Sequence, residues 1–98
     1  MGRVSQAELE RLRGMDVATI LPRIAEHVKA DHTFVPIKDQ ASARWHVTAR
    51  GREYELLSLG HKFYDTRQKR GGGGAIDLVM HLFQIDFKSA VAVLLEVL

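Results

Sequence analysis

The sequence of 98 residues contains no cysteine, only two prolines and one tryptophan. Without cysteine the chain can form no disulfide bond, no cysteine-based zinc site and no thiol nucleophile. Long apolar runs are missing too, because the run Val91–Leu95 is far shorter than the roughly 20 residues that a membrane span needs. The first residues also lack the apolar stretch of a signal peptide. We therefore expect a cytoplasmic protein that enters no membrane.

The composition is that of a globular protein, with 46% hydrophobic and 27% charged residues, and the length fits a single domain over residues 1–98. The net charge of +2 understates how basic the middle of the chain is. Residues 44–70 hold seven lysines and arginines against three acidic residues, a net charge of +4. Because an anionic partner is steered by local charge, we expect it to bind this middle third.

Capping signals mark the first and last helices. Ser5 and Glu8 have the spacing of a capping box, which predicts a short helix over residues 5–13 that ends at Gly14. Near the other end, Asp86 can cap a final helix with one apolar face. This helix has neither a capping glycine nor a polar tail at residue 98, which favours a fragment of a longer protein over an end that docks on a partner.

A second helix is expected after Asp16, which occupies an N-cap position. Apolar residues recur at helical spacing over residues 17–28, so the helix should run to about Ala30. Pro22 lies inside the pattern and should kink the helix or mark a new start.

The middle of the chain has strand character, because aromatic and β-branched residues cluster between turn glycines. A tight turn at residues 59–62 should join two of these strands. After four glycines, residues 75–83 return to helical spacing. The fold class is therefore α+β, a small antiparallel sheet flanked by N-terminal and C-terminal helices. The predicted strands are Phe34–Ile37, Arg44–Thr48, Glu53–Leu59 and Phe63–Asp65.

The most distinctive segment is the basic, glycine-rich stretch 67–77, which lies between a predicted strand and a predicted helix. Consecutive glycines let backbone amides approach a phosphate, and the following helix N-terminus adds positive partial charge. The pattern matches neither a Walker loop nor a dinucleotide-binding fingerprint. Two interpretations stay open: contact with an anion or nucleic acid, or a flexible surface loop whose glycines serve only as a turn and a helix cap.

Aromatic residues alternate with the basic ones. Phe63 and Tyr64 must point to opposite faces of a strand, one into the core and one outward. An exposed aromatic ring near arginine is a combination that single-stranded nucleic acid uses. For Trp45 the core role is favoured, and for Tyr64 stacking and packing are equally supported.

Neither a metal site nor a catalytic centre is predicted. The five histidines lack metal-ligand spacing, and no motif places a nucleophile beside a base. Asp77 falls in the first turn of its predicted helix, where a carboxylate complements the helix dipole and caps amides, so we assign it a structural role. No cofactor is expected.

Four segments together resemble a known family: Lys62–Asp65, the basic turn Arg67–Arg70, the Gly-Gly-Ala-Ile-Asp-Leu-Val-Met sequence at 73–80, and Phe87–Val91. They resemble the N-terminal zinc-binding domain of bacterial DnaG-type primases and of primase-like TOPRIM proteins of plasmids and other mobile elements. The likeness covers residues 62–95, with weaker support back to residue 20.

The family's zinc ligands are absent here. Two of its cysteines would fall near Thr66 and Lys69, so the chain is similar to the cysteine-free branch of the family, in which packing must replace the metal. The resemblance implies a zinc-ribbon-like fold without zinc. It also implies a template-recognition module for DNA replication, attached to a catalytic domain that this chain does not contain.

The sequence thus predicts a non-catalytic domain that binds nucleic acid, with single-stranded DNA as the expected partner. A TOPRIM-type catalytic domain of the same protein or a helicase would be a further partner, and the parent protein could be an enzyme. The alternative is a protein-interaction module that docks a catalytic domain or a replication partner. The candidate binding residues are Arg44, Arg52, Lys62, Tyr64, Arg67, Lys69, Arg70, Gly72, Gly73 and Gly74.

Overall fold

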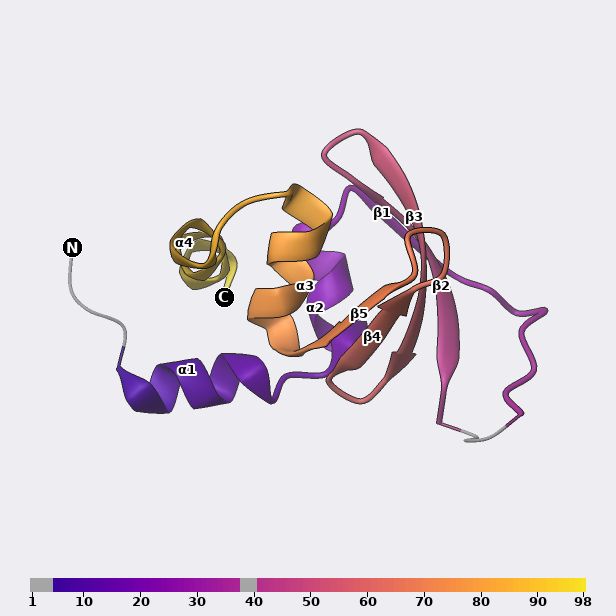
Figure 1. Cartoon of the computed structure of the whole chain (residues 1–98), viewed down its shortest axis with the longest axis horizontal. Helices are drawn as coiled ribbons and strands as arrows, with labels where there is room; N and C mark the ends of the chain where they lie inside the picture. Colours follow the sequence, from indigo (N-terminus) through magenta and orange to yellow (C-terminus); the bar gives the residue numbers. More distant parts are fainter. Residues whose placement is uncertain (1–4, 38–40) are drawn as a thin grey trace.

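The computed structural model describes residues 5–37 and 41–98, which form a five-stranded antiparallel sheet and four helices. The α+β class predicted from the sequence is confirmed. All four helices lie on one face of the sheet, and among the described residues the segment 31–37 that follows the first strand lies toward the other face (Figure 1). The strands follow one another across the sheet in chain order.

The first helix, α1, spans Gln6–Arg13 as predicted, with Ser5 as its N-cap. The Glu8 amide donates to Ser5 Oγ at 3.1 Å, which satisfies one of the amides that a helix start leaves unpaired. Leu12 is fully buried and Leu9 is partly buried against the same core, so these two apolar side chains pack α1 against the rest of the fold.

The second helix is shorter than predicted. It spans Val17–Ile24 as α2, and the expected continuation to Ala30 was wrong because His27–Ala30 forms strand β1 instead. This strand pairs with the next strand, β2 (Ala43–Ala49), and the Glu26 amide just before β1 donates to the Thr48 carbonyl at 2.8 Å. The helical spacing that includes Val28 therefore spans two elements, both of which bury apolar side chains against one core.

The segment Phe34–Ile37 is not a strand, contrary to the prediction. It belongs to the connection between β1 and β2. Asp31 turns the chain immediately after β1, and its side chain accepts from the Thr33 amide at 2.9 Å. Pro36 has no amide hydrogen to give to a strand ladder, so the apolar composition of this segment does not lead to pairing.

Strands β2 (Ala43–Ala49), β3 (Arg52–Leu59) and β4 (Lys62–Asp65) form two successive hairpins, as the sequence indicates. The turns between them contain Gly51 at φ 76° and Gly60 at φ 59°, a backbone region that glycine adopts without steric cost. The turn predicted at residues 59–62 is confirmed.

The glycine run is a strand and not a loop. Arg70–Gly73 forms β5, the edge strand that pairs with β4, and Gly74 begins the next helix. A methyl group at Gly72 would lie 3.0 Å from the Phe63 ring. The run is therefore glycine-rich in part because Phe63 fills the space that a side chain would occupy.

The last two helices confirm the predicted pattern. Helix α3 spans Gly74–Phe83 and α4 spans Phe87–Val97, with Asp86 accepting from the Ser89 amide at 2.8 Å as the N-cap of α4. Helix α3 packs between the sheet and α4, and it supplies Leu78, Val79 and Leu82 to the core.

Among residues 5–37 and 41–98, no single helix is long and apolar enough to cross a membrane. Helices α3 and α4 together reach the required length and composition, with a bend of 108° between them.

Candidate nucleic-acid interface

The strand register assigns alternate residues to the two faces of the sheet. Tyr54, Leu56 and Phe63 point toward the helices and are buried. Their neighbours point the other way, and one row of cross-strand partners runs over the helix-free face from β2 to β5. The members of this row are Arg44, Leu57, Tyr64 and Gly71. We call the helix-free side the open face.

Tyr64 is the exposed aromatic residue of the open face. Its side chain is 42% exposed, whereas Phe63 beside it is 5% exposed on the opposite face. The predicted alternation is confirmed. Tyr64 owes this exposure in part to Gly71, its partner on β5, which has no side chain to cover the ring. Part of the phenol ring is thus left accessible beside the edge strand β5.

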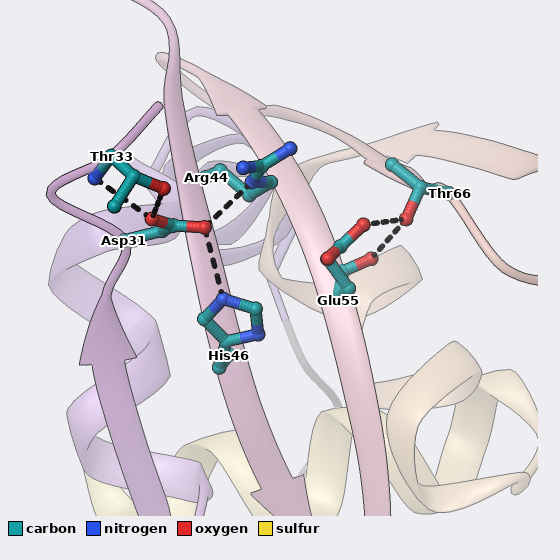
Figure 2. A network of polar contacts seen from close by, with 6 residues as sticks. All are labelled: Asp31, Thr33, Arg44, His46, Glu55 and Thr66. Atoms are coloured by element: carbon teal, nitrogen blue, oxygen red, sulfur yellow. Dashed lines mark hydrogen bonds and ion pairs between the residues drawn. The ribbon is translucent and has the colours of Figure 1, made fainter. Parts of the chain in front are cut away.

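Arg44, a predicted binding residue, already has partners within the protein. Its Nε donates to Asp31 Oδ2 at 2.9 Å, and its guanidinium lies 5.2 Å from the centre of the Phe34 ring (Figure 2). The side chain therefore ties the connection after β1 to the open face. Its charge is offset by a carboxylate at contact distance.

Asp31 is the centre of this network. Besides Arg44, its carboxylate accepts from the Thr33 hydroxyl at 2.6 Å and the Thr33 amide at 2.9 Å, and it lies 3.1 Å from His46 Nε2 (Figure 2). The Thr33 hydrogen bonds, followed by those of His46 and Arg44, hold the pKa of Asp31 well below its ordinary value. The carboxylate is thus charged at neutral pH and organises the start of the connection.

A second contact on the same side of the sheet anchors the basic turn. The Thr66 hydroxyl lies 2.5 Å from Glu55 Oε2 and 3.3 Å from the Glu55 carbonyl oxygen (Figure 2). The Thr66 amide donates to the same carbonyl at 3.2 Å. These bonds attach the turn that follows β4 to the neighbouring strand β3.

The basic turn is organised from beneath by Asp65, which is 1% exposed. One carboxylate oxygen accepts from the amides of Arg67 and Gln68, both at 2.9 Å, and the other lies 2.7 Å from His81 Nε2. Burial opposes ionisation of Asp65, but the hydrogen bonds from Gln68, His81 and Arg67 outweigh it and lower the pKa of this carboxyl group.

The contact between the Asp65 carboxylate and the His81 ring was not predicted from the sequence. The two residues lie 16 positions apart, on β4 and α3, and no local motif joins them. The rings of Tyr54 and Phe63 each lie 5.8 Å from the His81 ring, centre to centre. The burial of Asp65 and its partner on α3 both depend on how that helix packs.

Four of the five remaining predicted basic residues lie at the two ends of the β4–β5 hairpin. Lys62 begins β4, where it pairs with Leu59 and Gly73, whereas the turn at the other end of the hairpin carries Arg67 and Lys69 and leads into Arg70. Arg52 lies at the start of β3. Within residues 5–37 and 41–98, no carboxylate forms an ion pair with any of these five side chains.

The amides of Gly73 and Gly74 both have acceptors within the protein. Gly73 donates to Asp77 Oδ2 at 3.2 Å, which confirms the structural role predicted for Asp77, and Gly74 donates to the His61 carbonyl at 2.7 Å. Gly74 also has φ 88°, and a methyl group there would lie 2.6 Å from the Arg13 carbonyl oxygen. These glycines join the edge strand to α3. The phosphate contact suggested for Gly72, Gly73 and Gly74 stays a prediction.

Trp45 packs against the core, as favoured from the sequence. Its side chain is half-buried, and its indole Nε1 donates to Ser58 Oγ at 2.8 Å. The hydroxyl of Ser58 is thereby paired on the helix side of the sheet. Trp45 is therefore not available as a stacking surface on the open face.

A groove of about 440 Å³ lies beside Tyr64 on the open face. Leu57, Leu59 and Lys62 line it from the sheet, and the segment Phe34–Ile37 lines it from the connection between β1 and β2. The groove is thus bounded mainly by apolar side chains, with Lys62 as its one basic residue among those described.

Within the part of the chain that the structure describes, no group of three or more histidine, aspartate or glutamate side chains is arranged to hold a metal ion. The hydrogen bonds of Asp65 and Thr66 organise the turn that follows β4.

No protein-family model matches the sequence, and no solved structure matches it significantly. A stretch of 39 residues, 40% of the chain, is 50% identical to part of a protein of Zymomonas mobilis subsp. mobilis that is named "65 kDa protein". The chain spans 7% of the length of that relative.

Proposed function

We propose that this chain is a non-catalytic domain that binds single-stranded DNA along the β4–β5 hairpin. The observation that carries the proposal is the exposed ring of Tyr64 on a sheet face without helices, with Lys62 at one end of the hairpin and the basic turn at the other. Single strands bind to such surfaces because bases stack on aromatic rings while phosphates pair with basic side chains.

The charges of the hairpin support this assignment. Lys62, Arg67, Lys69 and Arg70 lie on a single hairpin and form no ion pair with the described residues. Phosphate binding releases counterions and is therefore favourable for cations that are not already neutralised. Arg44 differs, because Asp31 already neutralises it, and we assign it a supporting role in place of direct phosphate contact.

The resemblance to the N-terminal domain of primase-like proteins supports the same function. It further suggests a parent protein in which this domain presents template DNA to a TOPRIM-type catalytic domain, or works beside a helicase. The domain itself we propose to be without catalytic activity. The Asp65–His81 pair, which has the residue types of a catalytic dyad, has side chains only 1% and 8% exposed and serves to organise the turn.

The proposal is tested by replacing Arg67, Lys69 and Arg70 together by alanine and measuring affinity for a short oligothymidylate over a range of salt concentrations. Three lost phosphate contacts should weaken binding and make the slope of log affinity against log salt shallower by about 2. The matched control replaces Arg11, Arg23 and Lys88, which lie on the helices, and should leave the slope unchanged. Equal binding by the folded hairpin variant and the unaltered protein would contradict the proposal.

A second candidate function is a protein-interaction module, favoured by one observation on α4. Phe87, Leu95 and Leu98 are each 40–43% exposed along this helix and its end. An apolar docking surface would give binding that depends little on salt, in contrast to phosphate contacts. If the unaltered protein binds no oligonucleotide at low salt, this second function becomes the better hypothesis.

A further inference from the structure

The groove beside Tyr64 has a chemical character different from that of the basic turn. Leu57 and Leu59 lie on its sheet side together with Tyr64, and no acidic residue lines it among those described. A ligand that enters it must therefore present an apolar or planar surface, and any charge that it carries next to Lys62 must be negative.

The wall opposite the sheet is held in place by the Asp31 network. The Phe34 amide donates to the Asp31 carbonyl at 3.2 Å, and the Arg44 guanidinium lies over the Phe34 ring. Arg44 is in turn held by the Asp31 carboxylate (Figure 2). The network fixes the start of the segment 34–37, so the groove has a preformed wall next to the sheet.

Large apolar side chains near the groove are exposed to solvent. Val35 is 76% exposed and Ile37 is 94% exposed, both in the segment that lines the groove. Covering such side chains with a planar ring removes apolar surface from water and is favourable. The volume of about 440 Å³ lies within the range of about 300 to 1,000 Å³ that is typical of small-ligand pockets.

We infer that this groove binds one unpaired nucleobase of the DNA strand, which stacks against Tyr64 while an adjacent phosphate lies near Lys62. The inference rests on the proposed function and deepens it, because it gives a reason for preferring single strands. A base in a duplex is stacked and paired, and its release into a pocket costs a few kcal/mol. An apolar peptide side chain is disfavoured as the occupant because the charged residue that lines the groove, Lys62, is basic and would attract a polyanion.

The experiment compares two single strands of equal length and charge, a twelve-residue oligothymidylate and its abasic counterpart. The unaltered protein should bind the oligothymidylate about tenfold more tightly, in keeping with the energy of stacking one base on an aromatic ring. Tyr64→Ala should abolish this preference while leaving the affinity for the abasic strand unchanged. Tyr64→Phe keeps the ring and should retain the preference.

A second variant tests the groove without changing Tyr64, in case the Tyr64 variants fold poorly. Val35→Ser alters an exposed residue of the opposite wall, and it should reduce the preference for the oligothymidylate without changing affinity for the abasic strand. Native far-ultraviolet circular dichroism verifies the fold of each variant.

The outcomes separate this inference from the proposed function. If the unaltered protein binds both strands equally and with a steep salt dependence, phosphate binding stands and the base-binding groove is overturned. Equal affinity for a duplex of the same length would overturn the groove as well. If neither strand binds at low salt, both proposals fail, and occupation of the groove by a protein partner becomes the explanation to pursue.

Discussion

The two faces of the sheet can be compared at adjacent residues of one strand. Leu56 points toward the helices and is fully buried, whereas Leu57 points to the open face and lines the groove. The two leucines are identical in chemistry and differ only in which side of β3 they occupy. Side-chain alternation thus makes one residue part of the core and leaves its neighbour available to a ligand.

The two tyrosines of the sheet extend the comparison. Tyr54 is 3% exposed, and its hydroxyl donates to the Leu82 carbonyl at 2.9 Å on α3. Tyr64 is 42% exposed on the other face. The covered face uses an aromatic residue to pack and to satisfy a helix carbonyl, and the open face presents one to solvent. The predictions below test whether stability depends on the first face and binding on the second.

The largest difference in stability is expected between Leu56→Ala and Leu57→Ala. Loss of a fully buried leucine side chain removes transfer free energy and leaves a cavity, so Leu56→Ala should lower the free energy of unfolding by about 3 kcal/mol. Leu57→Ala should lower it by about 1 kcal/mol, because part of that side chain is already in contact with water. Urea denaturation measures both values. Equal losses would show that the open face is covered in solution.

Asp65→Asn should lower the free energy of unfolding by about 2 to 3 kcal/mol, because it weakens the hydrogen bonds to the basic turn and leaves His81 buried without its charged partner. Asp31→Asn on the open face is the matched control and should cost less, since water reaches that network. Thermal denaturation of the two variants compares them. A larger loss for Asp31→Asn would reverse the assignment of stabilising roles.

A smaller effect is expected in the glycine run. Gly74→Ala places a methyl group 2.6 Å from the Arg13 carbonyl oxygen at a φ of 88°, and it should cost about 2 kcal/mol. At Gly73 the backbone is extended, with φ −145°, and the nearest atom to a new methyl group belongs to the exposed His61 ring. Gly73→Ala should therefore cost less than about 1 kcal/mol. If both substitutions are equally well tolerated in urea denaturation, α1 does not pack against Gly74 in solution.

The smallest effect is a dependence of stability on acid. The pKa values of Asp31 and Asp65 both lie below the ordinary value of 3.8 in the folded protein. The stabilisation that they provide is therefore complete above that pH and is lost as the pH falls below it. Between pH 7 and pH 5 both carboxylates stay charged, so they should contribute no change to the urea midpoint. Below pH 4 the midpoint should decline. The decline should be shallower in Asp65→Asn, and an unchanged pH profile in that variant would contradict the argument.

Local chemistry in the sequence determined much of this protein. Ser5 and Asp86 mark helix starts because their side chains accept from nearby amides, and those interactions involve only residues three positions apart. The hairpin at residues 59–62 follows from turn chemistry in the same way. The alternation of Phe63 and Tyr64 follows from the pleat of a strand, whatever the strand packs against.

Tertiary structure decided the features that depend on residues far apart in the chain. The segment His27–Ala30 carries a helical pattern but forms a strand, because its backbone groups form a ladder with those of β2. The glycine run became an edge strand because β4 lies beside it and Phe63 fills the space above Gly72. The pairing of Asp65 with His81 and the neutralisation of Arg44 by Asp31 join residues 16 and 13 positions apart. Sequence periodicity predicts which residues can be buried. Only the packing of the folded chain determines which residues cover them, and which opposite charge lies beside a charged side chain.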